Sequence, residues 1–316
     1  MNRELAMKVA DAVLYEGYML YPYRRSALKN RQRWAFGTLY PPDYEEVRRG
    51  TERSSMHSEC LLKSEGGARA EVQLRFLQLV KRAGLERDDD PVVFGSEDES
   101  IERSVKIEIA ADPHTYKCFK FIFPDGTSDE EAQSDGSSNH IQGAVSLSAK
   151  PVEPNLLKLI IEVTNETLLG SGDHERHQAL LHAFLMAHLI LEAKGGEFVS
   201  LLDPPAELRA HISDCRNLGN FPVLLGAEHE HEMMLCSPII LYDHPQIAPE
   251  SAGDFFDCTE MDEMLTLRVM TLTDDEKQEV QTTDERLRTL LERTEQSARE
   301  QLSKTHGVIR NLRSGK

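Results

Sequence analysis

Apolar and polar residues alternate along much of the middle of this chain, with the two-residue period typical of half-buried β-strands. In the clearest stretch, residues 70–77, the apolar Val72, Leu74 and Phe76 alternate with charged or amide side chains. Comparable apolar stretches predict further strands at 58–62, 92–94, 105–109, 118–123, 141–150, 156–165, 221–225 and 233–241. This many short strands separated by turns favours a β-sandwich.

Two glycine pairs, Gly66-Gly67 and Gly195-Gly196, each stand between two apolar stretches. Because paired glycines allow the backbone conformations of a tight two-strand turn, each pair predicts a β-hairpin. Residues 177–188, shortly before the second pair, are rich in Ala, Leu and Met, so helix and strand both stay open for them.

The last sixty residues change to a helical pattern. Thr259 with Asp262, and Thr273 with Glu276, have the spacing of capping boxes, which begin helices. After the second box an apolar seam continues at helical spacing, at Val280, Leu287, Leu290, Leu291, Ala298, Leu302, Ile309 and Leu312. This seam predicts one helix of about 40 residues and about 60 Å, so we expect part of it to project or to pack on another chain.

The first fifty residues differ from the rest, with a short amphipathic helix over residues 5–13 and then a basic, tyrosine-rich segment. The predicted fold class is therefore α+β, with a β-rich core that has the pattern of a β-sandwich. We expect three parts: an N-terminal arm over 1–50, the core over 51–250, and a helical extension over 251–316.

The chain carries 54 acidic and 36 basic residues, a formal net charge of −18. That charge argues against nucleic acids and anionic membranes as partners, because both are themselves negatively charged. The sequence has no apolar run long enough to cross a bilayer, and its charged start lacks the apolar centre of a secretory signal, so we expect a cytoplasmic protein. Five cysteines without a CxxC pair favour reduced thiols.

The common nucleotide-binding, hydrolase and zinc-protease motifs do not occur in the sequence, so no catalytic residue is assigned. Histidine supplies the candidate chemistry. On a strand, His229 and His231 would point to one face about 7 Å apart, and Asp243-His244 follow a predicted strand end. The candidate ligands for zinc or nickel are therefore His229, His231, Asp243 and His244. The alternative is that His229 with His231, and Asp243 with His244, both lie in turns and bind no metal. The histidines within 174–188 are expected to be solvated or core residues.

The basic, tyrosine-rich segment is the most informative feature. Tyr, Arg and Trp are the residue types that dominate protein interfaces, and residues 24–33 carry cations without a single acid. We therefore predict a partner-binding surface formed by Tyr18, Tyr21, Tyr23, Arg24, Arg25 and Trp34. The alternative is an ordinary helix and strand packed against the core.

Four stretches of the sequence carry a resemblance when they are taken together: 14–24 with Lys29-Asn30 and Arg33-Trp34, 195–205, 237–251, and 253–268. They resemble an uncharacterised bacterial family associated with gene clusters of oxygen-tolerant NiFe-hydrogenases. The resemblance extends over most of the chain, carries no catalytic residue, and implies an accessory, maturation or complex-forming role beside a metalloenzyme.

Two functions of different classes are therefore expected. The first is a non-enzymatic accessory protein, without a resident cofactor, that binds a hydrogenase subunit or its assembly factors. The alternative is a metal-binding protein or enzyme that uses the histidine-rich site on the β-rich core. A homo-oligomer formed through the C-terminal helix is a third, structural possibility.

Overall fold

The computed structural model describes residues 3–20, 23, 30, 34, 36–81, 98–124, 140–170, 172, 174–247, 262–283 and 285–305. By its internal contacts the chain divides into two compact units. The first unit consists of Met1–Tyr15, Trp34–Asp89 and Glu97–Gln246, and the second of Glu16–Arg33, Asp90–Ser96 and Ile247–Lys316. The predicted N-terminal arm is thus divided between the two units.

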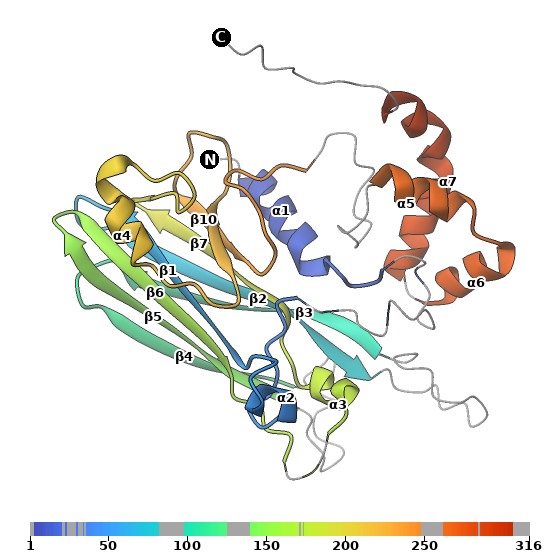
Figure 1. The fold of residues 1–316 in the computed structure, drawn as a ribbon, viewed down its shortest axis with the longest axis horizontal. Coiled ribbons are helices and arrows are strands. Elements are labelled where there is room, and N and C mark those ends of the chain that lie inside the picture. Colours follow the sequence, from blue (N-terminus) through green and yellow to red (C-terminus); the bar gives the residue numbers. More distant parts are fainter. Residues whose placement is uncertain are drawn as a thin grey trace. The chain divides into compact units, whose positions relative to one another are not determined.

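The first unit contains two antiparallel sheets of five strands each (Figure 1). The order in one sheet is β4 (Tyr116–Phe123), β5 (Ile141–Glu153), β6 (Leu156–Asn165), β1 (Ser55–Lys63) and β8 (Glu197–Phe198). The order in the other is β3 (Asp98–Ala110), β2 (Arg69–Lys81), β7 (Leu185–Lys194), β10 (Met233–Ser237) and β9 (Phe221–Leu224). The predicted α+β, β-rich fold is confirmed.

The alternation seen in the sequence places one face of each strand in a core that the two sheets share. The rings of Phe76, Phe121 and Phe184 meet there, with ring centroids 4.5 Å apart for Phe76 and Phe184. Gly143 on β5 lies directly under these rings, since a Cβ at this position would be 2.7 Å from Phe184 and 2.6 Å from the Thr164 carbonyl oxygen. The close approach of the two sheets at this point therefore requires glycine.

Both predicted glycine hairpins are wrong. β1 and β2 flank Gly66-Gly67 but lie in different sheets, and so do β7 and β8 on either side of Gly195-Gly196. The glycines do form sharp bends, with φ of +113° at Gly66 and +75° at Gly195, but each bend carries the chain from one sheet to the other. A glycine pair predicts a turn, whereas the sheet that the next strand joins is decided by packing.

The ambiguous stretch before the second glycine pair contains both elements. α3 (Arg176–Leu181) is a short helix, and β7 begins four residues later at Leu185. Among the described residues, the first unit also contains the short helical elements α2 (Glu45–Arg48), the 3-10 turn η3 (Ala206–Leu208) and α4 (Arg209–Ser213).

The predicted N-terminal helix, α1 (Arg3–Tyr15), covers the outer face of the second sheet. Its buried side chains Ala6, Val9, Ala10 and Val13 form one apolar cluster with residues of β7, β9 and β10. Two ion pairs fix it at the sides, Arg3 to Glu192 at 3.1 Å and Asp11 to Arg75 at 2.7 Å.

The predicted single long C-terminal helix is wrong. The second unit contains α5 (Asp262–Met270), α6 (Asp274–Thr283) and α7 (Glu285–Thr305), and α7 packs against both α5 and α6. Lys277 Nζ is 2.7 Å from Glu295 Oε1, whereas one continuous helix would separate these residues by about 27 Å. The predicted capping box is present, because Glu276 accepts from the Thr273 amide at 2.9 Å.

The described part of the predicted apolar seam is buried within the chain. Val280, Leu287, Leu290 and Leu291 are each at most 1% exposed. Self-association through this seam stays a prediction.

Within the described ranges, no helix combines the length and the apolar character that crossing a membrane requires. The strand predicted at 92–94 and the capping box at Thr259 lie outside the described residues, as do Tyr21, Arg24 and Arg25.

Candidate functional site

The described aromatic residues of the predicted partner-binding surface are all buried. Tyr18 is 4% exposed, Tyr23 is 0% exposed and Trp34 is 3% exposed. The guanidinium of Arg286 on α7 lies 5.7 Å from the ring centre of Tyr18. The structure gives these three rings a packing role inside the chain, so their contact with a partner stays a prediction that would require the segment to move.

The first half of the predicted metal site lies in a turn, as the alternative interpretation of His229 and His231 expected, and not on a strand. Residues 226–229 turn between β9 and β10, and His229 is exposed at the turn. The Glu230 carboxylate closes the turn by accepting from the Ala227 amide at 3.0 Å. His231 is half-buried, with its Nδ1 3.4 Å from the Phe198 carbonyl oxygen.

The second half of the predicted site is anchored to the end of β9. Asp243 Oδ1 accepts from the Leu224 amide at 2.7 Å, and its Oδ2 accepts from the Ser200 hydroxyl at 2.5 Å. The His244 amide donates to the Leu224 carbonyl at 2.8 Å. Asp243 therefore holds this part of the chain in place through both of its carboxylate oxygens.

Of the four predicted ligands, the structure brings two imidazoles together. The rings of His231 and His244 are 6.1 Å apart between centroids and lie edge to face. Nδ1 of His244 is buried and has no hydrogen-bond partner in the described part of the chain. Over the same residues, no group of three or more His, Cys, Asp or Glu side chains is arranged to hold a metal ion.

The loop 238–242 between β10 and Asp243 exposes large apolar side chains. Ile240 is 97% exposed and Tyr242 is 81% exposed. The loop is fixed at both ends. Pro238 packs on Gly37, where a Cβ would come within 2.7 Å of the proline ring, and Asp243 makes the two bonds described above.

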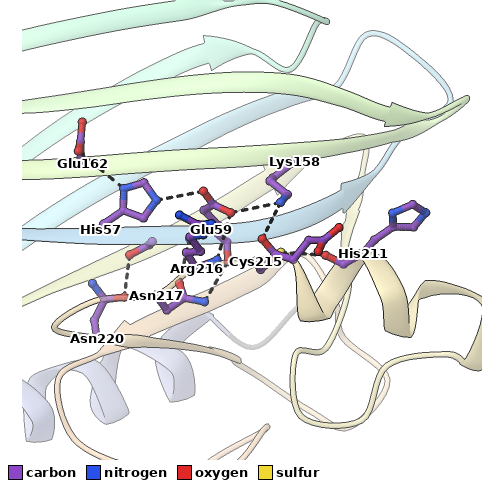
Figure 2. A network of polar contacts seen from close by, with 11 residues as sticks. His57, Glu59, Lys158, Glu162, His211, Cys215, Arg216, Asn217 and Asn220 are labelled. Carbon is purple, nitrogen blue, oxygen red and sulfur yellow. Dashed lines mark hydrogen bonds and ion pairs between the residues drawn. The ribbon is translucent and has the colours of Figure 1, made fainter.

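A polar network that the sequence did not predict lies on the outer face of the first sheet (Figure 2). Its centre is Glu59 on β1, whose Oε1 is 3.1 Å from His57 Nε2 and whose Oε2 is 3.2 Å from Lys158 Nζ on β6. The Arg216 amide donates to the same Oε2 at 3.1 Å. His57 and Glu59 alternate with buried residues on one strand, so in sequence they resemble any polar strand face.

The network holds the segment 214–220 against the sheet. The Asn217 side chain accepts from the Glu59 amide at 2.9 Å, Asn220 accepts from Ser58 at 2.7 Å, and Lys158 donates to the Asp214 carbonyl at 3.0 Å. Burial raises the pKa of the Glu59 carboxyl, but the bonds from His57, Arg216 and Lys158 outweigh it and hold the pKa below its ordinary value. A carboxylate that accepts this many hydrogen bonds is suited to fixing a loop. It is poorly suited to proton transfer, because these bonds stabilise its charged form.

Two hollows flank the short helical segment of η3 and α4. One, of about 770 Å³, lies beside Gly195-Gly196, and its lining includes Glu65, Glu153, Glu197, Glu207 and Glu232. The other, of about 320 Å³, is lined by Glu59, Lys150, Lys158, His211 and Asp214 among others. His211 Nε2 is 2.8 Å from Glu153 Oε1, so one hydrogen bond joins the lining of the two hollows.

The buried thiols are unreactive in this environment. Cys60 and Cys236 are fully buried in the core, and burial raises the pKa of Cys236 to about 12. The four cysteines of the described ranges form no disulfide.

Comparison with known proteins gives no family. No family model matches the chain, and no curated protein matches it. A solved structure that does match is the secretin InvG of the Salmonella SPI-1 type III secretion injectisome in its open gate state. The match has 9% sequence identity and a TM-score of 0.13 and covers 52% of this chain and 44% of the secretin chain. At this TM-score the two structures do not share a fold.

Proposed function

We propose that this chain is a non-enzymatic accessory protein that binds a hydrogenase subunit or one of its assembly factors. The observation that supports this proposal is the loop 238–242, which is anchored at both ends and presents two large side chains to solvent. The loop lies within 237–251, one of the stretches that carry the resemblance to the hydrogenase-associated family.

Leaving these two side chains in water has a cost in free energy. A fully exposed isoleucine gains about 1.5–3 kcal/mol when a partner buries it, and tyrosines are frequent energetic centres of interfaces. Because Pro238 and Asp243 already fix the loop, little conformational entropy is lost when it binds. Phe36, which precedes Gly37 in the sequence, is also an exposed apolar residue, at 50%.

The test is co-purification from a native host that produces hydrogenase. A tagged full chain is isolated under gentle conditions, and hydrogenase subunits and assembly factors are quantified by mass spectrometry relative to the tagged chain. We expect the double substitution Ile240→Asp with Tyr242→Ala to lower the hydrogenase signal at least about tenfold.

The matched control is Leu168→Asp, which changes an apolar side chain that is 66% exposed elsewhere in the first unit. It should leave co-purification unchanged. The accessory role is wrong if the unmodified chain brings down no hydrogenase component. If the loop variant co-purifies as well as the unmodified chain, the loop is not the contact surface.

A second candidate function, metal binding, is favoured by the two imidazoles of His231 and His244. Nδ1 of His231 faces the Phe198 carbonyl, which leaves its Nε2 as the nitrogen for a metal. Nδ1 of His244 has no hydrogen-bond partner among the described residues. Two such nitrogens with water as further ligands would suit zinc or nickel.

Equilibrium dialysis against zinc and against nickel tests this candidate. We expect about one equivalent of metal bound, reduced at least about tenfold by His231→Ala or His244→Ala. His229→Ala is the control, since that histidine is exposed in the same turn. Equal loss in all three variants, or no binding by the unmodified chain, would contradict a site at these residues.

A further inference from the structure

The two imidazoles of His231 and His244 are carried by a backbone that is fixed on both sides. The His231 carbonyl accepts from the Phe198 amide at 2.7 Å, and the His244 amide donates to the Leu224 carbonyl at 2.8 Å. Asp243, the neighbour of His244, is bound through both of its carboxylate oxygens. The imidazoles therefore form a preorganised pair of ligands.

The separation of the two rings fits a single metal ion. A zinc ion lies about 2.0–2.1 Å from each imidazole nitrogen that binds it, which puts the centres of two ligating rings about 5–6 Å apart. The ring centroids of His231 and His244 are 6.1 Å apart, so a small side-chain movement is enough. Nδ1 of His244 is buried without a hydrogen-bond partner in the described structure, and a metal bond would satisfy it.

The backbone at His244 is an independent indication that its side chain is used. Its φ is +53°, which lies in the left-handed region that glycine occupies at the lowest cost. Non-glycine residues that are held in this region are concentrated at active sites and ligand sites. The imidazole is thus retained at a position where its backbone is strained.

The imidazole pair supplies only half of the ligands of a metal site. Zinc in structural protein sites is almost always bound by four protein ligands. Over the described residues, no group of three or more His, Cys, Asp or Glu side chains is arranged to hold a metal ion. The remaining coordination positions are therefore open to ligands from outside the described structure.

The neighbouring loop 238–242 indicates where those ligands come from. Tyr242 is separated from His244 by one residue, and Tyr242 and Ile240 are 81% and 97% exposed. A protein that covers this loop is therefore within reach of the open metal positions. A second copy of this chain fits less well, because each copy brings a net charge of −18, which keeps the chains apart.

We infer that His231 and His244 form half of a metal site that a partner protein completes. The partner covers Ile240 and Tyr242 and contributes histidine or cysteine side chains to a zinc or nickel ion. The metal then holds the complex together, so the two candidate functions belong to one surface. The inference rests on the proposed accessory role and adds that docking requires metal.

The first test uses the purified full chain with an equivalent of cobalt(II), which replaces zinc and absorbs visible light. 2-Mercaptoethanol is the probe for the open positions. Its addition should produce a thiolate–cobalt band and raise the visible absorption several-fold, because the thiol displaces water and the site becomes tetrahedral. His231→Ala and His244→Ala should each abolish this response, whereas the control His229→Ala should keep it.

The second test repeats the co-purification of hydrogenase components with EDTA present. EDTA should lower the hydrogenase signal at least about tenfold, because it removes the bridging metal, and excess zinc or nickel should restore the signal. His244→Ala should lower the signal as far as EDTA does, and added metal should not restore it. His229→Ala should behave as the unmodified chain in every condition.

The two tests separate the metal bridge from the accessory role. Co-purification that withstands both EDTA and His244→Ala would overturn the metal bridge and leave the accessory role intact. A cobalt spectrum that the thiol does not change would do the same. If no hydrogenase component co-purifies in any condition, the accessory role is wrong and the inference falls with it.

Two further results would assign the open positions to another source and overturn the inference. One is a thiolate–cobalt band in the chain without added thiol that disappears in Cys258→Ser, which would mean that this chain completes its own site. Cys258 lies outside the described residues. The other is a dimer that light scattering detects only with zinc and never in His244→Ala, which would identify a second copy as the source.

Discussion

At the scale of single residues, His188 shows how burial sets the state of a titrating group. The imidazole is fully buried on β7, and its Nδ1 is 2.9 Å from the Met186 carbonyl oxygen. Burial lowers the pKa of His188 to about 4, and the nearby guanidinium of Arg75 lowers it further, while the bond to Met186 acts in the opposite direction. Asp11 on α1 and Glu102 on β3 both pair with that guanidinium, so side chains of α1, β2 and β3 meet at Arg75.

The lowered pKa of His188 predicts that the free energy of unfolding decreases on mild acidification. Unfolded His188 takes up a proton as the pH falls through 6.5, whereas folded His188 takes it up only near pH 4. The folded state therefore loses stability from pH 6.5 downward, by about 3 kcal/mol once the pH is below 4. Urea unfolding at pH 7, 5.5 and 4 should show a smaller loss in His188→Gln than in the unmodified chain.

His229→Gln is the control for that measurement, because His229 is exposed and should follow the unmodified chain. Parallel pH curves for His188→Gln and the unmodified chain would contradict a neutral buried imidazole. Of the two environments that the sequence allows for the histidines within 174–188, solvent or core, His188 lies in the core.

At the scale of elements, Glu59 joins a strand to a loop that lies far away in the sequence. Its side chain is 11% exposed and bonds to groups on β1, β6 and the segment 214–220. Glu162 on β6 is also near His57, at 3.7 Å, but its side chain is 62% exposed. The two carboxylates therefore differ in environment while they share the same histidine.

We expect Glu59→Gln to lower the free energy of unfolding by about 1–3 kcal/mol, because Lys158 then keeps its charge without its carboxylate partner. Hydrogen exchange within 214–220 should become faster. Glu162→Gln is the control and should cost less than about 0.5 kcal/mol. Equal effects of the two substitutions would contradict the assigned role of Glu59.

The helices and strands also show which features could be predicted from the sequence. Strands such as β5 and the cap at Thr273 were predictable, because period and capping are local properties. The partner strand across each glycine pair, and the reversal between α6 and α7, were not, because they depend on contacts between distant residues. The network at Glu59 was missed for the same reason.

At the scale of the whole molecule, the net charge of −18 exerts a repulsion that every compact state must overcome. Dissolved salt screens this repulsion over about 10 Å at 0.1 M. At pH 7 the melting temperature should therefore rise by a few degrees between about 10 and 150 mM sodium chloride. Near pH 5.1, where the formal charge is zero, the same addition should have little effect. An equal response at both pH values would contradict a repulsive origin.

The chain crosses from one sheet to the other at each glycine pair, and these two crossings affect how it folds. β1 pairs with β6 about a hundred residues later, and β2 pairs with β7 at a still larger separation. During synthesis β1 must therefore wait, with its apolar face uncovered, until most of the first unit has left the ribosome. Closing such distant pairs is slow, so this protein should fold on the timescale of milliseconds to seconds and depend on chaperones at high concentration.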